Sequence, residues 1–345
     1  MSRILLISNR ANRQIALLHS ICCRHNIPSR IIYMDEMPRV TLGDGGVVIG
    51  GRKVRGPGSG YQSGIRPDYF AAPDIPDGMA NFSAFLDGQP MREQQLSHAM
   101  SMMAMLARTD GFRMVNEPMS RYDLNGQTAL LLRMAAGGAD VPELLLTNDY
   151  DSFLRSNLAE VDGPLWWSHP FANAPIKIIK KDKIKKLLES VREFPVQIMR
   201  PVEGEFIRLW YIDDRPLLIA RQSLPEYSGR REGLEKFEYY APNENSINVG
   251  KFLNNYIDGF YEIDGVIDED GRLWVIRFDP DPCFTFLGDG GAEYLASKLI
   301  ESLAGFAGID ARIDIEIPEA DERTTLFLTR MIETLIATEQ AAGEK

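Results

Sequence analysis

The sequence has few cysteines and no long apolar run. Only Cys22, Cys23 and Cys283 are present, and two of them are adjacent, which excludes a disulfide framework. No stretch of about 18 apolar residues occurs, and no basic segment followed by an apolar one opens the chain, which argues against a membrane helix and a secretory signal. We therefore expect a cytoplasmic protein in a reducing compartment.

Positive charge is also in deficit. The chain carries 38 Lys and Arg against 49 Asp and Glu, a net charge of −11. Binding to nucleic acid or to anionic lipid requires a basic face that displaces counterions, so we expect neither nucleic acid nor membrane as a partner. The one basic cluster, Lys177 to Lys186, is predicted to be the solvated face of a helix rather than a phosphate-binding patch.

The two common glycine motifs for phosphate binding are missing. The segments 50–52 and 56–60 are rich in glycine, but neither fits Gly-x-Gly-x-x-Gly or a P-loop with its Lys-Ser/Thr. We interpret both as turns, and residues 56–90, with many Gly, Pro and Asp, as a long connecting loop.

What the sequence does contain is enough for a folded chain of about two domains. Apolar residues make up 44% of its 345 residues, which excludes a disordered chain. A strand at 3–8, a helix at 14–26 and strands at 31–34 and 47–50 predict an α/β start with an open parallel sheet.

The second half reads as short strands and hairpins between helices. No internal repeat is visible, and an amphipathic helix beyond about residue 318 is expected to pack on the body or on a second copy, which leaves a homo-oligomer open. The expected elements are hairpins at 206–221 and 265–278 and helices at 93–109, 127–137, 249–260 and 292–304.

The segment from Asp264 to Pro280 carries the clearest chemical pattern. Alternation along the second strand of this hairpin places Arg277 and Asp279 on one face, and the hairpin can bring Asp279 close to Asp264. Two carboxylates on neighbouring strands suit Mg²⁺, which takes hard oxygen ligands.

Together with several other segments in order, this pattern resembles the ATP-grasp superfamily, and most closely the maturases of microviridin-type peptides (graspetides). The resemblance covers about residues 95–305. The matching segments are 115–118 (VNEP), 125–127 (NGQ), 141–149 (VPELLLTND), 166–170 (WWSHP), 205–209 (EFIRL), Asp264 and 277–280 (RFDP).

The resemblance implies an ATP-grasp fold of α/β and α+β domains. An N-terminal Rossmann-like pre-ATP-grasp domain is expected at 1–110 and a central lobe at 111–195. A C-terminal lobe at 196–310 and a helical extension at 311–345 would complete the chain.

The resemblance also implies a chemistry and places residues in it. ATP and Mg²⁺ would convert a carboxylate of a peptide or small molecule into an acyl phosphate, which an amine or hydroxyl then attacks. Arg208 matches the arginine that contacts the transferred phosphoryl group, Asp264 and Asp279 match metal ligands, and Gln197 takes the hinge position beside the nucleotide.

Three positions depart from the family pattern. Gln127 and His169 stand where two lysines contact ATP, although Lys180 could replace the second by a shifted strand. Arg277 stands where a glutamate binds the metal and is expected to form ion pairs with Asp264 and Asp279. Two functions therefore stay open: an ATP-dependent ligase acting on a peptide or amino acid, and a degenerate ATP-grasp protein that binds a peptide or partner without catalysis.

Overall fold

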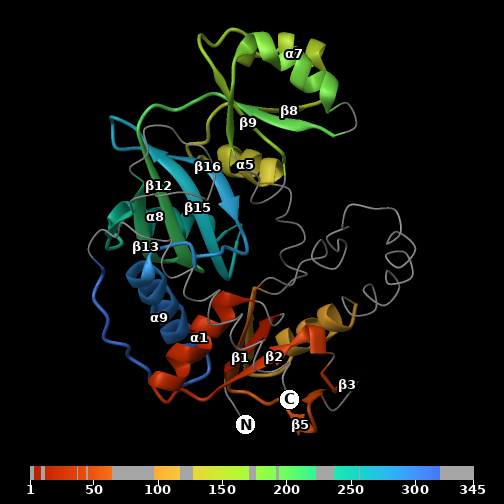
Figure 1. Cartoon of the computed structure of the whole chain (residues 1–345), viewed down its shortest axis with the longest axis vertical. Coiled ribbons are helices and arrows are strands. Elements are labelled where there is room, and N and C mark those ends of the chain that lie inside the picture. The colour runs from red at the N-terminus through yellow and green to blue at the C-terminus, as the bar shows by residue number, and fades with distance from the viewer. Residues whose placement is uncertain are drawn as a thin grey trace, which may run out of the picture. The chain divides into compact units, whose positions relative to one another are not determined.

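The structure is a computed structural model, and the chain divides into two compact units. It describes residues 4–8, 12–36, 38–43, 46–63, 97–116, 127–170, 176–191, 194–222, 237–255 and 257–318. Unit 1 combines Met1–Asp123 with Asp258–Phe260 and Ala296–Ile315, and unit 2 contains the remainder. Figure 1 labels the elements by their position in the chain. The four domain boundaries expected from the sequence remain predictions.

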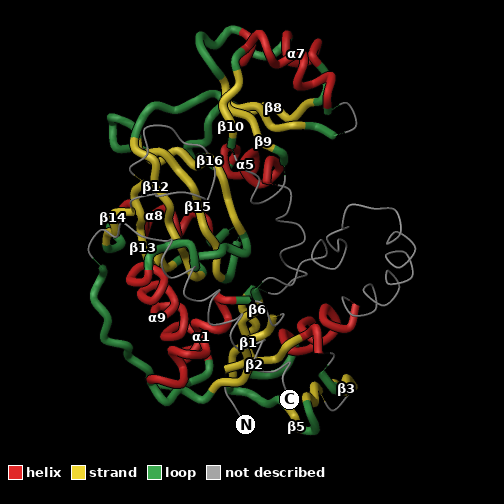
Figure 2. Tube along the Cα trace, viewed as in Figure 1, coloured by secondary structure: helices red, strands yellow, loops and turns green. Residues whose placement is uncertain are grey.

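Unit 1 contains a parallel sheet of four strands in the order β2-β1-β6-β7, drawn in yellow in Figure 2. Helix α1 packs Ile15, Leu18 and Ile21 inward and begins at Asn12, whose side chain accepts the Ile15 N–H. The strands are β1 (Ile4–Ser8), β2 (Ser29–Tyr33), β6 (Gly58–Gln62) and β7 (Phe112–Val115), and α1 is Arg13–Arg24. The predicted parallel sheet is confirmed; the finer label of a Rossmann-like domain remains a prediction.

The membership of this sheet differs from the expectation in two ways. The predicted strand at 47–50 exists as β4 (Gly46–Ile49), but it pairs antiparallel with β3 (Val40–Gly43) and β5 (Arg52–Lys53) in a separate small sheet. The predicted loop at 56–90 is wrong at its start, because residues 58–62 form the buried strand β6.

Gly60 of β6 serves close packing and not a turn. A Cβ on Gly60 would lie 2.7 Å from Met114 Sδ and 3.1 Å from Phe112 Cε1, so a larger residue would require these side chains of β7 to move. The remainder of the predicted loop, residues 64–90, lies outside the described residues. Residues 97–107 are helical and contribute Met102, Met103 and Leu106 to the core, so the described part of the helix predicted at 93–109 is confirmed.

The first sheet of unit 2 is antiparallel, in the order β10-β9-β11-β8. Helix α7 covers it in Figure 1, with Ile184 and Leu188 packed among Leu165, Val196 and Ile198. The elements here are α5 (Gln127–Ala136), β8 (Leu144–Thr147), α6 (Tyr150–Leu154), β9 (Leu165–Ser168), β10 (Lys177–Ile179), α7 (Lys181–Ser190) and β11 (Val196–Met199), with 3-10 turns at Met34–Glu36 in unit 1 and Asn157–Ala159 here.

The second sheet of unit 2 has five antiparallel strands in the order β14-β13-β12-β15-β16. Both predicted hairpins are confirmed, and Asp213 adopts a φ of 54° at the first turn. The elements are β12 (Glu205–Ile212), β13 (Arg215–Gln222), β14 (Phe237–Tyr240), α8 (Glu244–Leu253), β15 (Phe260–Ile267) and β16 (Leu273–Asp279). Helix α9 (Asp289–Phe306) begins in unit 2 and belongs to unit 1 from Ala296 onward.

The bounds of α8 correct the helix predicted at 249–260. A capping box between Asn243 and Ser246 fixes its start, and Phe260 already belongs to β15. The amphipathic helix predicted beyond residue 318 lies outside the described residues. Among the helices that the structure describes, none has both the length and the apolar character needed to span a membrane.

Candidate functional site

One face of the five-stranded sheet collects charged side chains from three adjacent strands. Arg208 lies on β12, Glu262 and Asp264 on β15, and Arg277 and Asp279 on β16. Asp264 pairs in register with Arg277, and Glu262 with Asp279. Because side chains alternate along a strand, the intervening apolar residues face the opposite side. We call these five residues the charged cluster.

Two arginines converge on one carboxylate in the charged cluster. Arg208 Nε lies 3.3 Å from Asp264 Oδ1, and Arg277 Nη2 contacts Asp264 Oδ2. The same Arg277 nitrogen also donates to Glu262 Oε1 at 3.3 Å. The ion pair between Asp264 and Arg277 is therefore present, as the hairpin predicted.

The charged cluster is almost completely shielded from solvent. Side chains of Arg208, Glu262, Asp264 and Arg277 are at most 2% exposed. Charges in such a place are costly unless they are paired, so each partner depends strongly on the others. Arg208 Nη1 is buried and makes no hydrogen bond among the described residues, although its guanidinium carbon lies 5.0 Å from the centre of the Phe286 ring.

Asp279, the second expected metal ligand, is also buried. It is 1% exposed, and its Oδ1 accepts the backbone N–H of Asp281 at 3.0 Å. The sequence analysis missed Glu262 as the second carboxylate beside Arg277. Two-residue alternation from Asp264 could have found it, because Glu262 precedes Asp264 by two positions.

An apolar cluster extends the same face toward the first sheet of unit 2. Val266 on β15 and Ile276 on β16 pack with Trp166 on β9, Met199 on β11 and Ile176. These contacts place the charged cluster on the side of its sheet that faces strands β8 to β11.

The other predicted site residues are spread over the first sheet and its connections. Gln197 is fully buried on β11; its Oε1 accepts from Thr128 Oγ1 at 2.6 Å and its Nε2 donates to Met199 Sδ. These bonds orient the amide and use one acceptor site of Oε1 and one proton of Nε2. Gln127 begins α5, but its side chain is not among the described ones.

His169 and Lys180 occupy different surroundings. His169 directly follows β9, is half-buried, and places its ring edge-on to Trp167 with 5.6 Å between the ring centres. Lys180 is exposed immediately before α7. Their assignments as ATP contacts stay predictions.

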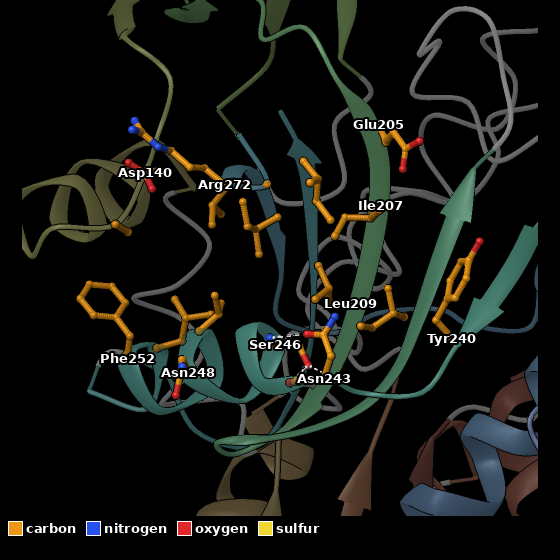
Figure 3. A pocket seen from close by; sticks show the side chains of 18 of the residues that line it. Asp140, Glu205, Ile207, Leu209, Tyr240, Asn243, Ser246, Asn248, Phe252 and Arg272 are labelled. Atoms are coloured by element: carbon orange, nitrogen blue, oxygen red, sulfur yellow. Dashed lines mark hydrogen bonds between the residues drawn. The ribbon is translucent and has the colours of Figure 1, made fainter. Parts of the chain in front are cut away.

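A separate pocket lies on the opposite face of the five-stranded sheet. Its volume is about 760 Å³. Ile207 and Leu209 of β12 line it, two positions that alternate with Arg208, and α8 forms a wall with Val249 and Phe252 (Figure 3). The sequence analysis did not predict this pocket, because its walls come together only when α5, α8 and the sheet pack.

Polar groups surround the apolar interior of the pocket. Arg221 Nη2 contacts Glu205 Oε1 at 2.5 Å, and Tyr240 donates its hydroxyl proton to Glu238 Oε2 at 2.6 Å. The hydrogen bond to Glu238 raises the pKa of Tyr240. The pocket therefore combines an apolar floor with a fixed polar edge, an arrangement that favours amphipathic ligands.

Comparison with known proteins bears on the fold. No protein-family model matches the sequence, and no curated protein sequence does either. Among solved structures, the ATP-grasp ligase PsnB, complexed with minimal precursor, Mg and ADP, aligns with a TM-score of 0.73 over 89% of this chain and 98% of PsnB. The chain has an ATP-grasp fold.

Two further solved structures are similar over most of the chain. The macrocyclase MdnC from Microcystis aeruginosa MRC, bound with precursor peptide MdnA, has a TM-score of 0.62 and covers 86% of this chain and 99% of its own. A RiPP-associated ATP-grasp ligase from Chryseobacterium gregarium, with ADP and a leader and core peptide, has a TM-score of 0.63 and covers 91% and 100%. The sequence identities are 16% to PsnB and MdnC and 12% to the Chryseobacterium ligase. At such identities the structural similarity shows the fold and does not show the reaction.

Proposed function

We propose that this chain is an ATP-grasp ligase-like protein that acts on a carboxylate of a peptide. The observation that carries the proposal is the ATP-grasp fold along about nine tenths of the chain, shared with ligases whose structures hold precursor peptides. Arg208 supports it, since the resemblance assigns to this position the arginine that contacts the transferred phosphoryl group.

The chemistry of Arg208 fits an anionic group. Its buried Nη1 is a charged donor with no hydrogen bond among the described residues, and a phosphate oxygen would satisfy it. ATP, when bound, supplies the phosphoryl group that turns a carboxylate into an acyl phosphate. Arg208 would hold that group and neutralise its charge, and the buried Asp264 fixes the direction of the guanidinium.

Magnesium fits the described residues poorly. Both oxygens of Asp264 face guanidinium nitrogens, and a cation entering there would meet two positive groups before it met a free ligand. Within the described part of the chain, no three His, Cys, Asp or Glu side chains form a group that could hold a metal ion. We derive no step of the reaction through a metal.

The pocket beside α8 is our candidate for the peptide-binding site. A volume of about 760 Å³ is in the range that accommodates a few side chains. Its apolar floor would take aliphatic or aromatic side chains, and its polar edge would face the peptide backbone. A peptide held there would lie on the opposite face of the sheet from Arg208, so its reacting carboxylate would belong to another part of the same peptide.

The nucleotide part of this proposal is tested by titrating ATP into the wild type and Arg208→Lys. Lysine retains a positive charge beside Asp264 but lacks the guanidinium nitrogen that would meet the phosphate. We expect saturable heat from the wild type and an affinity at least about tenfold lower for the variant, the loss of one charge-assisted hydrogen bond.

The matched control is Arg221→Lys, the same change on the opposite face of the same sheet. It should leave ATP affinity unchanged. Equal affinity for the wild type and Arg208→Lys would show that Arg208 does not hold the nucleotide.

A second function, peptide binding without ligation, is favoured by one specific observation. Arg277 stands at the position where the family pattern has a metal-binding glutamate, and it is locked to Asp264 and Glu262. Both functions include peptide binding, and they differ in whether ATP is turned over.

A further inference from the structure

We propose that Arg277 replaces the divalent metal at this site, so that Asp264 and Asp279 do not hold Mg²⁺. The inference concerns the protein without nucleotide and does not require the proposed function to be correct. It rests on the charged cluster alone, where the residues disagree with the metal that the fold leads one to expect.

Both carboxylate oxygens of Asp264 lie next to arginine side chains. Of its two carboxylate oxygens, Oδ1 lies 3.3 Å from Arg208 Nε and Oδ2 contacts Arg277 Nη2. A cation that approaches either oxygen therefore meets a guanidinium within ion-pair distance. Like charges repel, so Mg²⁺ could reach its short ligand distance only if an arginine moved away.

Arg277 on β16 is held by two acids of the neighbouring strand β15. Arg277 is held from two sides, by Asp264 and by Glu262, and all three side chains are at most 2% exposed. Arg208 and Arg277 offset the charges of Asp264 and Glu262, and Asp279 adds a third buried carboxylate to the charged cluster. Mg²⁺ dehydrates reluctantly and prefers to keep several waters, which such a closed place does not offer.

Asp279 is the second of the two expected metal ligands. Asp279 is buried, and its Oδ1 is oriented by the Asp281 backbone N–H. Once Asp264 is engaged by the arginines, Asp279 is the one expected ligand left. A single protein carboxylate is a weak site for Mg²⁺ in the absence of a phosphate ligand.

The test uses Tb³⁺, a hard cation whose luminescence is sensitised by tryptophan, in competition with Mg²⁺. Trp210 lies on β12 two positions after Arg208 and therefore on the same face, where it can act as the sensitiser. The proteins compared are the wild type, the double variant Glu262→Arg/Arg277→Glu, and both of these with Asp264→Asn added.

For the wild type we expect no saturable, Mg²⁺-competed signal that depends on Asp264. The double variant keeps one arginine paired with one glutamate, so the ion pair survives while a carboxylate replaces the guanidinium on β16. It should gain a saturable signal, increased severalfold, that Asp264→Asn removes.

A saturable wild-type signal abolished by Asp264→Asn would overturn the inference. So would a double variant with a native circular dichroism spectrum and no gain in signal. If the double variant does not fold, Arg277→Gln tests the same point, because it frees Asp264 from this guanidinium without adding charge. A folded Arg277→Gln that gains no Asp264-dependent signal would likewise overturn it.

Discussion

At the scale of single residues, the arginines of the charged cluster differ from those on the surface. Arg277 is 2% exposed and contacts two acids, whereas Arg200 contacts Glu143 at 2.8 Å with 51% of its side chain exposed. Removing one partner of a buried pair leaves an uncompensated charge. Removing one partner of an exposed pair leaves a charge that water solvates.

Arg277→Ala should therefore lower the free energy of unfolding by about 3–5 kcal/mol, the cost of stranding a buried charge. Arg200→Ala is the matched control and should cost about 1 kcal/mol or less, as exposed ion pairs do. Urea unfolding followed by circular dichroism measures both. Similar losses of unfolding free energy for the two variants would contradict the view that the charged cluster excludes water and that its side chains depend on one another.

At the scale of elements, the sequence predicts what depends on local patterns. The turn at Asp213-Asp214 and the hairpin 265–278 follow from alternation and turn residues, and both are present. The exact partner of Asp264 does not follow from the hairpin alone, because a regular continuation from Ile267 and Leu273 would place Ile276 opposite Asp264. A register shift between Asp264 and Gly265 brings Arg277 there.

Elements that depend on distant contacts were mispredicted. Strand β6 is predicted as a loop because Gly58 and Gly60 are typical turn residues, yet Gly60 allows the close approach of Met114 and Phe112 on β7. The pocket could not be predicted for a similar reason, since three elements build it. The start of α8 is different, because a local signal sets it: the capping box of Asn243 and Ser246 begins the helix, whereas apolar spacing alone places its start at Val249.

Helix α8 also supplies a prediction about the pocket. Val249 lines the pocket, while Ile247, two positions earlier, is 39% exposed and is not among the lining residues. Val249→Glu would place a charge over the apolar floor. Peptides selected on the wild type from a display library of short random sequences should bind Val249→Glu at least about tenfold more weakly, the cost of burying an unpaired charge.

Ile247→Glu, the same substitution on the exposed side of α8, should leave peptide affinity unchanged. Fluorescence polarisation of the selected peptides measures both variants. Equal affinity of the wild type and Val249→Glu for the peptides would show that they bind outside this pocket.

In the molecule as a whole, the two candidate sites lie on opposite faces of the five-stranded sheet. The charged cluster lies on the face toward strands β8 to β11, and the pocket lies on the face covered by α8. A ligase needs both a nucleotide and a peptide, whereas a binding protein needs the peptide alone. The ATP-grasp fold is compatible with either, so turnover decides between them.

The most direct test of the central claim is trapping of an acyl phosphate. The wild type is incubated with ATP, hydroxylamine and the peptides selected on the pocket, and ADP and peptide mass are followed together. We predict peptide-dependent ADP formation and a peptide hydroxamate, both absent in Arg208→Ala. Tight peptide binding with neither ADP nor hydroxamate would contradict the ligase and establish binding without catalysis.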